Sequence, residues 1–120
     1  MKVVVSSQGG QLDSPVDGRF GRAKYFVLVD TDTGEAKAVD NSENLNALQG
    51  AGVQAAKKVA DLGAETVVAT NVGPKAFSVL STAGVRVFSG ASGTVAEAIE
   101  QLKAGQLSES DSANVQSRWT

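Results

Sequence analysis

Apolar and polar positions along the chain follow one another in short blocks, and the apolar blocks predict five strands. Two of them, residues 3–5 and 66–70, are β-branched and uncharged, as is typical of strands covered on both faces. Two others flank the turn residues 30–34 and predict a β-hairpin. The last contains Arg86, which indicates a position nearer the sheet edge. The predicted strands are residues 3–5, 25–29, 36–39, 66–70 and 85–88.

Three other segments repeat their apolar residues every three to four positions, which predicts helices over residues 48–62, 74–83 and 95–104. Pro74 suits a first helical turn, where no N–H is needed. Thr94 and Glu97 predict a capping box at the start of the third helix. The first helix contains Gly50 and Gly52, poor helix formers that indicate a close approach of its backbone to the sheet or to a ligand.

The order of these elements predicts an α/β fold, a single three-layer domain with a mixed, mostly parallel five-stranded sheet. Strands joined by helices run parallel through right-handed crossovers, and the hairpin pairs antiparallel. This domain covers residues 1–105. From residue 106 onward the composition becomes polar, so residues 106–120 are expected to form a mobile tail with Trp119 exposed.

The composition of the chain excludes several classes of function. No apolar stretch of the 120 residues approaches the roughly 18 that span a membrane. The first residues read as a strand and not as a signal peptide, which predicts a cytoplasmic protein without membrane contact. A net charge of −2 argues against a general nucleic-acid binder. The absence of cysteine and histidine excludes disulfides, a cysteine-ligated cluster and histidine acid–base chemistry.

Three loops, residues 6–22, 71–75 and 89–94, are expected to meet at the carboxyl ends of the strands, where open α/β sheets bind ligands. Together they offer backbone N–H groups, two helix N-termini and the cations Arg19, Arg22 and Lys75. This combination predicts an anion-binding site. In the alternative interpretation the glycines only close turns and the cations are solvated.

The sequence offers little for catalysis. Asp13 and Asp17 share a loop and could hold a hard cation, but turn formation is the simpler interpretation. Glycine-rich phosphate and dinucleotide motifs are absent. Ser6, Ser7 and Thr70 have no histidine to activate them. We therefore expect a binding protein and not an enzyme.

Three motifs in register resemble a known family: R-F-G-R-A-K-Y-F at 19–26, G-A-G-V-Q-A-A at 50–56, and T-N-V-G-P-K-A-F at 70–77 followed by A-G-V-R-V-F at 83–88. The resemblance, to the dinitrogenase iron–molybdenum cofactor-binding family of small carriers, covers residues 2–104. It implies a ribonuclease H-like fold and carriage of a metal–sulfur cluster. A short member without cysteine is most similar to carriers that hold a molybdenum–copper sulfide cluster non-covalently.

Such a cluster is an anion that brings its own sulfide ligands, which suits a chain with neither cysteine nor histidine. Several family members have a histidine or cysteine near the Gly50 segment, but this chain has Leu48 and Gln49 there, so such a side chain cannot ligate. The candidate cluster-binding residues are Arg19, Phe20, Gly21, Arg22, Gly50, Gly52, Asn71, Val72, Gly73, Lys75, Ser89 and Gly90.

Two other classes of protein are weighed against a carrier. A nuclease, which a ribonuclease H-like fold would suggest, needs clustered carboxylates that hold metal ions, and the first strand offers none. The alternative that stays open is a scaffold or regulatory binding protein in a cluster-assembly or ATPase-containing complex, with the tail and Trp119 as its contact.

Overall fold

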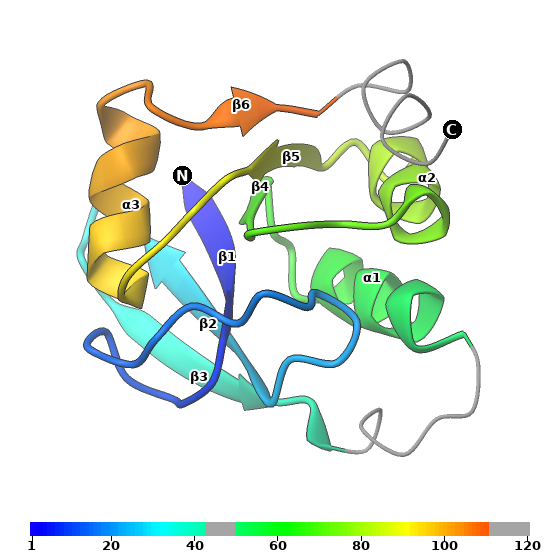
Figure 1. The fold of residues 1–120 in the computed structure, drawn as a ribbon, viewed down its shortest axis with the longest axis horizontal. Helices are drawn as coiled ribbons and strands as arrows, with labels where there is room; N and C mark the ends of the chain where they lie inside the picture. Colours follow the sequence, from blue (N-terminus) through cyan, green and yellow to red (C-terminus); the bar gives the residue numbers. More distant parts are fainter. Residues whose placement is uncertain (43–49, 111–120) are drawn as a thin grey trace.

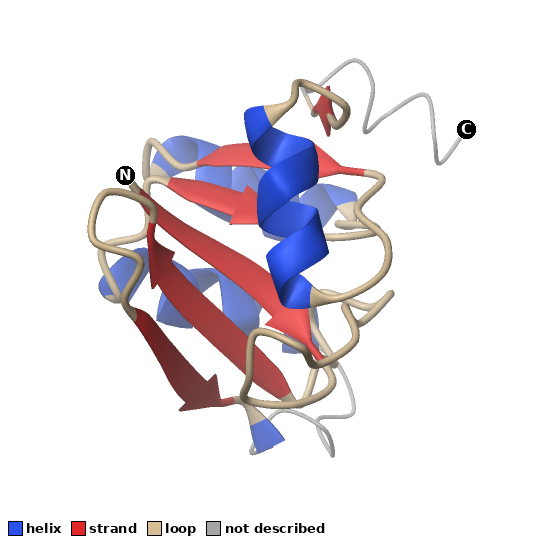
Figure 2. Ribbon diagram, turned by 90° about the vertical axis from the view of Figure 1, so that its left-hand side faces the viewer, coloured by secondary structure: helices blue, strands red, loops and turns tan. Residues whose placement is uncertain are grey.

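The fold is a six-stranded mixed sheet between two helical layers (Figure 1). The computed structural model describes residues 1–42 and 50–110. The strands lie in the order β3-β2-β1-β4-β5-β6. Their bounds are β1 (Lys2–Ser7), β2 (Tyr25–Asp30), β3 (Ala36–Asp40), β4 (Thr66–Val68), β5 (Arg86–Ser89) and β6 (Ser108–Glu109). Helices α1 (Ala51–Asp61) and α2 (Pro74–Thr82) cover one face, and α3 (Val95–Lys103) covers the other (Figure 2).

The predicted α/β class, the mixed sheet and the hairpin are confirmed, but two details of the sheet prediction are wrong. The sheet has six strands where five were predicted. It is also not mostly parallel, because only the β1–β4 and β4–β5 pairs run parallel while three pairs run antiparallel. The ribonuclease H-like designation stays a prediction.

Strand β1 lies in the middle of the sheet because its valines can be buried on both faces. Val3, Val4 and Val5 have no exposed surface. Val4 packs with the core beneath α1 and α2, whereas Val3 and Val5 pack with the core beneath α3. The sheet therefore separates two apolar cores, as a period-two strand covered on both sides requires.

The helices agree with the periodic pattern except near their ends. Helix α1 begins at Ala51 with Gly50 as its N-cap, and residues 48 and 49 of the predicted helix lie outside the described residues. Helix α3 has the predicted capping box, in which Thr94 accepts from the N–H of Glu97 and Glu97 accepts from the N–H of Thr94. Gly63, Gly84 and Gly105 each follow a helix with φ between 72° and 79°, the left-handed conformation in which glycine commonly ends a helix.

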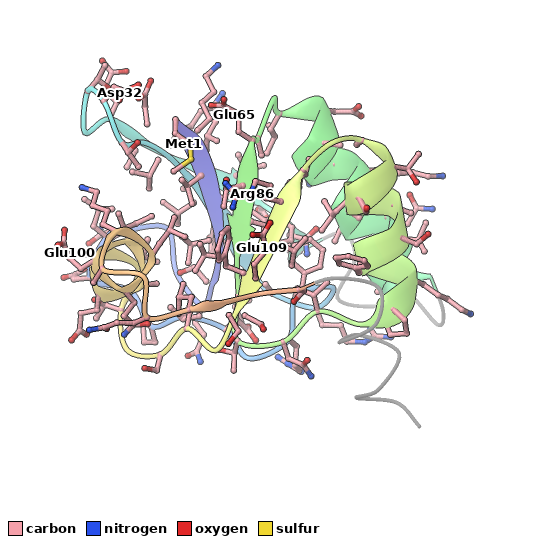
Figure 3. All side chains as sticks on the ribbon, turned by 90° about the horizontal axis from the view of Figure 1, so that it is seen from above. Met1, Asp32, Glu65, Arg86, Glu100 and Glu109 are labelled. Atoms are coloured by element: carbon pink, nitrogen blue, oxygen red, sulfur yellow. The ribbon has the colours of Figure 1, made fainter. Side chains whose placement is uncertain are left out.

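The sixth strand lies in the segment that the sequence assigned to a polar tail. Strand β6 pairs antiparallel with β5, and the N–H of Ser110 donates to the carbonyl of Val87 at 2.7 Å. Arg86 reaches across to Glu109 through two hydrogen bonds of 2.9 and 2.8 Å (Figure 3). Backbone pairing and this ion pair hold β6 against the edge of the sheet, although the sequence of β6 has no apolar pattern. Trp119 and its predicted exposure lie outside the described residues.

No helix within residues 1–42 and 50–110 is long and apolar enough to cross a membrane.

Candidate anion-binding pocket

A cavity of about 540 Å³ opens where the loop after β1 meets the first turns of α1 and α2. It lies at the carboxyl end of β4, where the chain passes through Asn71 and Gly73 into α2. Figure 1 shows the loop after β1, in blue, passing beside α1. The lining residues are Gly18, Arg19, Phe20, Gly21, Gly50, Gly52, Val53, Asn71, Gly73, Pro74, Lys75 and Ala76.

Two glycines form one corner of the cavity because their backbones touch. A Cβ atom added to Gly21 would lie 2.7 Å from both the Cα and the N of Gly52. No side chain fits at that separation, so the loop after β1 can approach α1 only with glycine at position 21. Gly52 thus lies against the loop after β1, a neighbour that was not predicted, and since it also lines the cavity its predicted approach to a ligand stays a prediction. Gly50 has φ 77°, a conformation that favours glycine.

The first turns of α1 and α2 both open into the cavity, and neither receives a side-chain cap from the residues that the structure describes. No side chain of the described residues accepts from the first-turn N–H groups at Gly50 or Gly73, the two N-caps. Pro74 has no N–H to satisfy. The first turn of a helix presents free N–H groups and a partial positive charge. Two such turns on one cavity favour an anionic ligand.

The N-terminus of α3, at the same end of the sheet, is closed. The N–H groups of Val95 and Ala96 donate to the carbonyls of Ser14 and Leu12 at 3.0 and 2.9 Å. The Thr94–Glu97 capping box satisfies the next N–H. This helix start was predicted to contribute to the site, and the prediction is wrong because carbonyls of the loop after β1 already accept its N–H groups.

The cations differ in how much their charge is neutralised. Arg19 and Lys75 both line the cavity, so the structure brings these two together. The backbone N–H of Arg19 donates to Asp17 Oδ1 at 2.9 Å, and its Nε lies 3.5 Å from the same oxygen. Among the described residues, Lys75 has no acidic partner within ion-pair distance. Asp17 Oδ1 accepts the backbone N–H of Arg19 within this loop, in agreement with the turn-forming interpretation.

Four predicted residues do not line the cavity. Arg22 is half-buried and has its own polar interaction. Val72 is 2% exposed and packs in the core beneath α1 and α2. Ser89 is buried at the end of β5, and the N–H of Gly90 donates to the carbonyl of Thr70. The third loop therefore meets the second as predicted, but its polar groups bond within the fold.

Four lining residues were not predicted, namely Gly18, Val53, Pro74 and Ala76. Each lies next to a predicted site residue in the sequence, and this adjacency was the sequence feature that could have identified them as lining residues. Val53 and Ala76 fall within predicted helices, and helical periodicity does not show which helix residues face a cavity.

Asn41 is a further residue of importance that sequence reasoning overlooked. It is completely buried, and its Nδ2 donates to the carbonyls of Gly21 and Ala23 at 3.5 and 2.8 Å. Its own N–H donates to the carbonyl of Lys24. Asn41 thus holds the loop segment that forms the glycine corner, although it appeared in the sequence only as part of a polar loop.

The cavity has apolar walls as well as polar ends. Phe20 is 2% exposed and packs on Phe26 with ring centroids 5.2 Å apart. Val53, Pro74 and Ala76 contribute further apolar surface. No group of three or more acidic, cysteine or histidine side chains among the described residues could hold a bare metal ion. A ligand of this pocket must therefore be bound by N–H groups, cations and apolar contact.

The structure is a single α/β domain whose candidate ligand pocket is lined by two helix starts, and the described part of the chain offers no cluster of metal-ligating side chains there. Comparison with known proteins names the family. The dinitrogenase iron-molybdenum cofactor family matches residues 1–105, and the chain belongs to that family.

Three relatives illustrate the similarity. The apo form of the orange protein from Desulfovibrio gigas is 39% identical, with a TM-score of 0.88 over 91% of this chain and 92% of that one. A NifB-like protein from Thermotoga is 38% identical, with a TM-score of 0.78 over 90% and 91% of the two chains. The uncharacterized protein MJ0580 of Methanocaldococcus jannaschii is 31% identical over 89% of each chain.

Proposed function

We propose that this protein is a non-catalytic carrier of an anionic metal–sulfur cluster, a molybdenum–copper sulfide, which it binds non-covalently in the pocket between the loop after β1, α1 and α2. Membership of the dinitrogenase iron-molybdenum cofactor family and similarity to the orange protein support a cluster as the cargo. The observation that carries the proposal is the meeting in one cavity of two helix starts that no side chain within residues 1–42 and 50–110 caps.

The chemistry of the lining fits such a cargo. A sulfide cluster presents weak acceptor atoms of negative charge, for which N–H groups and the cations Arg19 and Lys75 are suitable donors. The same sulfides are large and polarisable and pack well against Phe20 and Val53. The metals within the cluster already have sulfur ligands, so the chain needs neither cysteine nor histidine.

Reconstitution tests the proposal directly. Apo-protein is mixed with tetrathiomolybdate and a cuprous salt in reducing buffer and passed through gel filtration. We expect a coloured protein fraction that contains molybdenum and copper in a fixed ratio. Loss of both metals on the column would overturn the proposal.

A matched pair of variants localises the cluster. Lys75→Ala removes a cation that lines the cavity, and Lys57→Ala removes an exposed cation from the polar face of α1. Lys58 is a poorer control because its Nζ donates to the carbonyl of Asp40 at 2.6 Å. Retention of the cluster should fall in Lys75→Ala and stay unchanged in Lys57→Ala. Equal losses in the two variants would indicate diffuse attraction and a different site.

A further inference from the structure

The loop after β1 contains a carboxylate that is fixed in place beside one of the pocket cations. Asp17 is 4% exposed. Its N–H donates to the carbonyl of Ser6 at 3.0 Å, and its own carbonyl accepts from the Ser6 hydroxyl at 3.2 Å. On the preceding residue, the N–H of Val16 donates to the carbonyl of Gly93 at 2.8 Å. These bonds attach the Asp17 backbone to β1 and to the start of α3, and the carboxylate is itself held by the backbone N–H of Arg19, which donates to Oδ1 at 2.9 Å.

The cation beside this carboxylate is much less constrained. The side chain of Arg19 is 69% exposed, whereas that of Asp17 is 6% exposed. The Nε of Arg19 lies 3.5 Å from Asp17 Oδ1, longer than the 2.7–2.9 Å or so of a strong charge-assisted bond. The guanidinium can therefore turn toward a ligand while the carboxylate stays.

Asp17 and Arg19 lie on a boundary between two cavities. Gly18 and Arg19 line the main pocket and also a second, polar cavity of about 460 Å³. Asp17 lines only the second cavity, together with Gln8 and Lys24. An anion in the main pocket would thus approach Arg19 from one side, while Asp17 contacts Arg19 from the other side.

We propose that Asp17 sets the affinity of the pocket by competing with the bound anion for Arg19. This inference rests on the proposed function. The carboxylate offsets part of the charge that Arg19 would otherwise offer, so the protein binds its cargo more weakly than its two cations alone would allow. A carrier benefits from this arrangement, because moderate affinity permits release to an acceptor.

The decisive variant is Asp17→Asn. Asparagine keeps the Oδ1 acceptor for the backbone N–H of Arg19 and removes the negative charge. The dissociation constant for tetrathiomolybdate with cuprous copper, measured by spectroscopic titration at low salt, should fall about five- to tenfold, less than a full hydrogen bond to a charged group contributes, because the exposed Arg19 is partly screened by solvent. Asp13→Asn makes the same charge change at an exposed position of the same loop and should alter affinity less than twofold or so, because solvent screens it.

A double variant distinguishes competition for Arg19 from a general effect of the protein's net charge on anion binding. In an Arg19→Ala background there is no guanidinium to compete for, so Asp17→Asn should no longer tighten binding. A loss of affinity in folded Asp17→Asn, an equal gain in Asp13→Asn, or an undiminished gain in the Arg19→Ala background would each overturn the inference. A purely structural role for Asp17 predicts weaker binding and not tighter binding.

The single variants Lys75→Ala and Arg19→Ala test the role of Asp17 even if Asp17→Asn does not fold. Because Arg19 has an acidic partner in Asp17 and Lys75 has none among residues 1–42 and 50–110, Lys75→Ala should lose more affinity than Arg19→Ala. An equal or larger loss in Arg19→Ala would overturn the inference. Binding by the wild-type protein distinguishes the two proposals: no binding defeats both, whereas binding that Asp17→Asn does not tighten defeats only the role of Asp17.

Discussion

The starts of α2 and α3 lie at the same end of the sheet and yet have opposite properties. At the start of helix α3, Thr94 and Glu97 form a capping box, and the N–H groups of the two residues between them donate to carbonyls of the loop after β1. Helix α2 begins with Gly73 and Pro74 and receives no side-chain cap from the described residues. One helix start is therefore used to fasten a loop, and the other faces a cavity.

This difference explains why the pocket lies on one side of the sheet. The loop after β1 crosses from α3 to α1, and it closes one helix start with its carbonyls and touches the other helix with Gly21. A helix N-terminus binds an anion only when its N–H groups are free. The loop, and not the helix dipole, selects which starts remain available.

The largest expected effect comes from giving α2 the kind of cap that α3 has. Gly73 has φ −70° and ψ 164°, and a Cβ there would meet nothing within 4 Å, so Gly73→Asp is sterically allowed. Its carboxylate would accept from the first-turn N–H groups and repel an anion, and affinity for thiomolybdate with copper should fall about ten- to a hundredfold. Thermal unfolding should show unchanged or slightly raised stability. Unchanged affinity in a stably folded variant would contradict an anion site at this helix start.

A similar effect is expected when the glycine corner is opened. Gly21→Ala forces the loop after β1 away from α1, since its Cβ would lie 2.7 Å from Gly52, and should destabilise the fold by about 1–3 kcal/mol while weakening binding. Chemical denaturation measures the first change, and titration measures the second. Gly18→Ala is the control, because its Cβ would meet nothing within 4 Å. Equal stability of the two variants would show that the contact is not tight.

Removal of Lys75 should have a moderate effect that is confined to binding. Lys75 is exposed, and its ammonium contributes about 1–1.5 kcal/mol to an anion bound nearby, or about five- to tenfold in affinity. The effect should shrink at high salt, which screens exposed charges. Titration of Lys75→Ala at two salt concentrations checks both statements, with Lys57→Ala as the control. A salt-independent loss would point to a packing role for the side chain.

Removal of the α3 cap should change stability and leave binding alone. Thr94→Ala loses the hydroxyl that accepts from Glu97 and should cost about 1 kcal/mol of unfolding free energy. Thr82→Ala, at an exposed position in the last turn of α2, should stay within about 0.5 kcal/mol of wild type. Denaturant midpoints give the comparison. Weaker anion binding by folded Thr94→Ala would break the distinction between the two helix starts.

The smallest effect is expected at the ion pair on the far edge of the sheet. Hydrogen bonds from Arg86 lower the pKa of Glu109 below its ordinary value. A carboxyl with a lowered folded-state pKa contributes stability above its unfolded pKa, and this contribution is lost as the pH falls through the folded-state pKa. Both side chains are exposed, so the change should be slight. Glu109→Gln should flatten the acid limb of the stability curve without altering anion affinity.

Much of the fold was predictable because its signals are local. Consecutive buried valines in β1, the periodic apolar residues of α3 and its capping box each depend on residues within a few positions of one another. Helical and strand periodicity express such short-range relations directly. The two-residue strand β6 was missed for the same reason, since it is held by backbone pairing to β5 and by Arg86, 23 positions away from Glu109.

The sequence by itself determined the pieces of the site, namely the Gly-Pro start of α2, the cations Arg19 and Lys75, and the absence of metal-ligating cysteine and histidine. The tertiary structure alone decided how they are used. It closed α3 with the carbonyls of Leu12 and Ser14, set Gly21 against Gly52, and fixed Asp17 beside Arg19. The first and second of these contacts join positions far apart in the chain, and all three depend on the path of a loop that has no periodic pattern. Because a hydrogen bond or an ion pair depends on where its partner lies in space, the sequence could name the groups but not the partners that free or neutralise them.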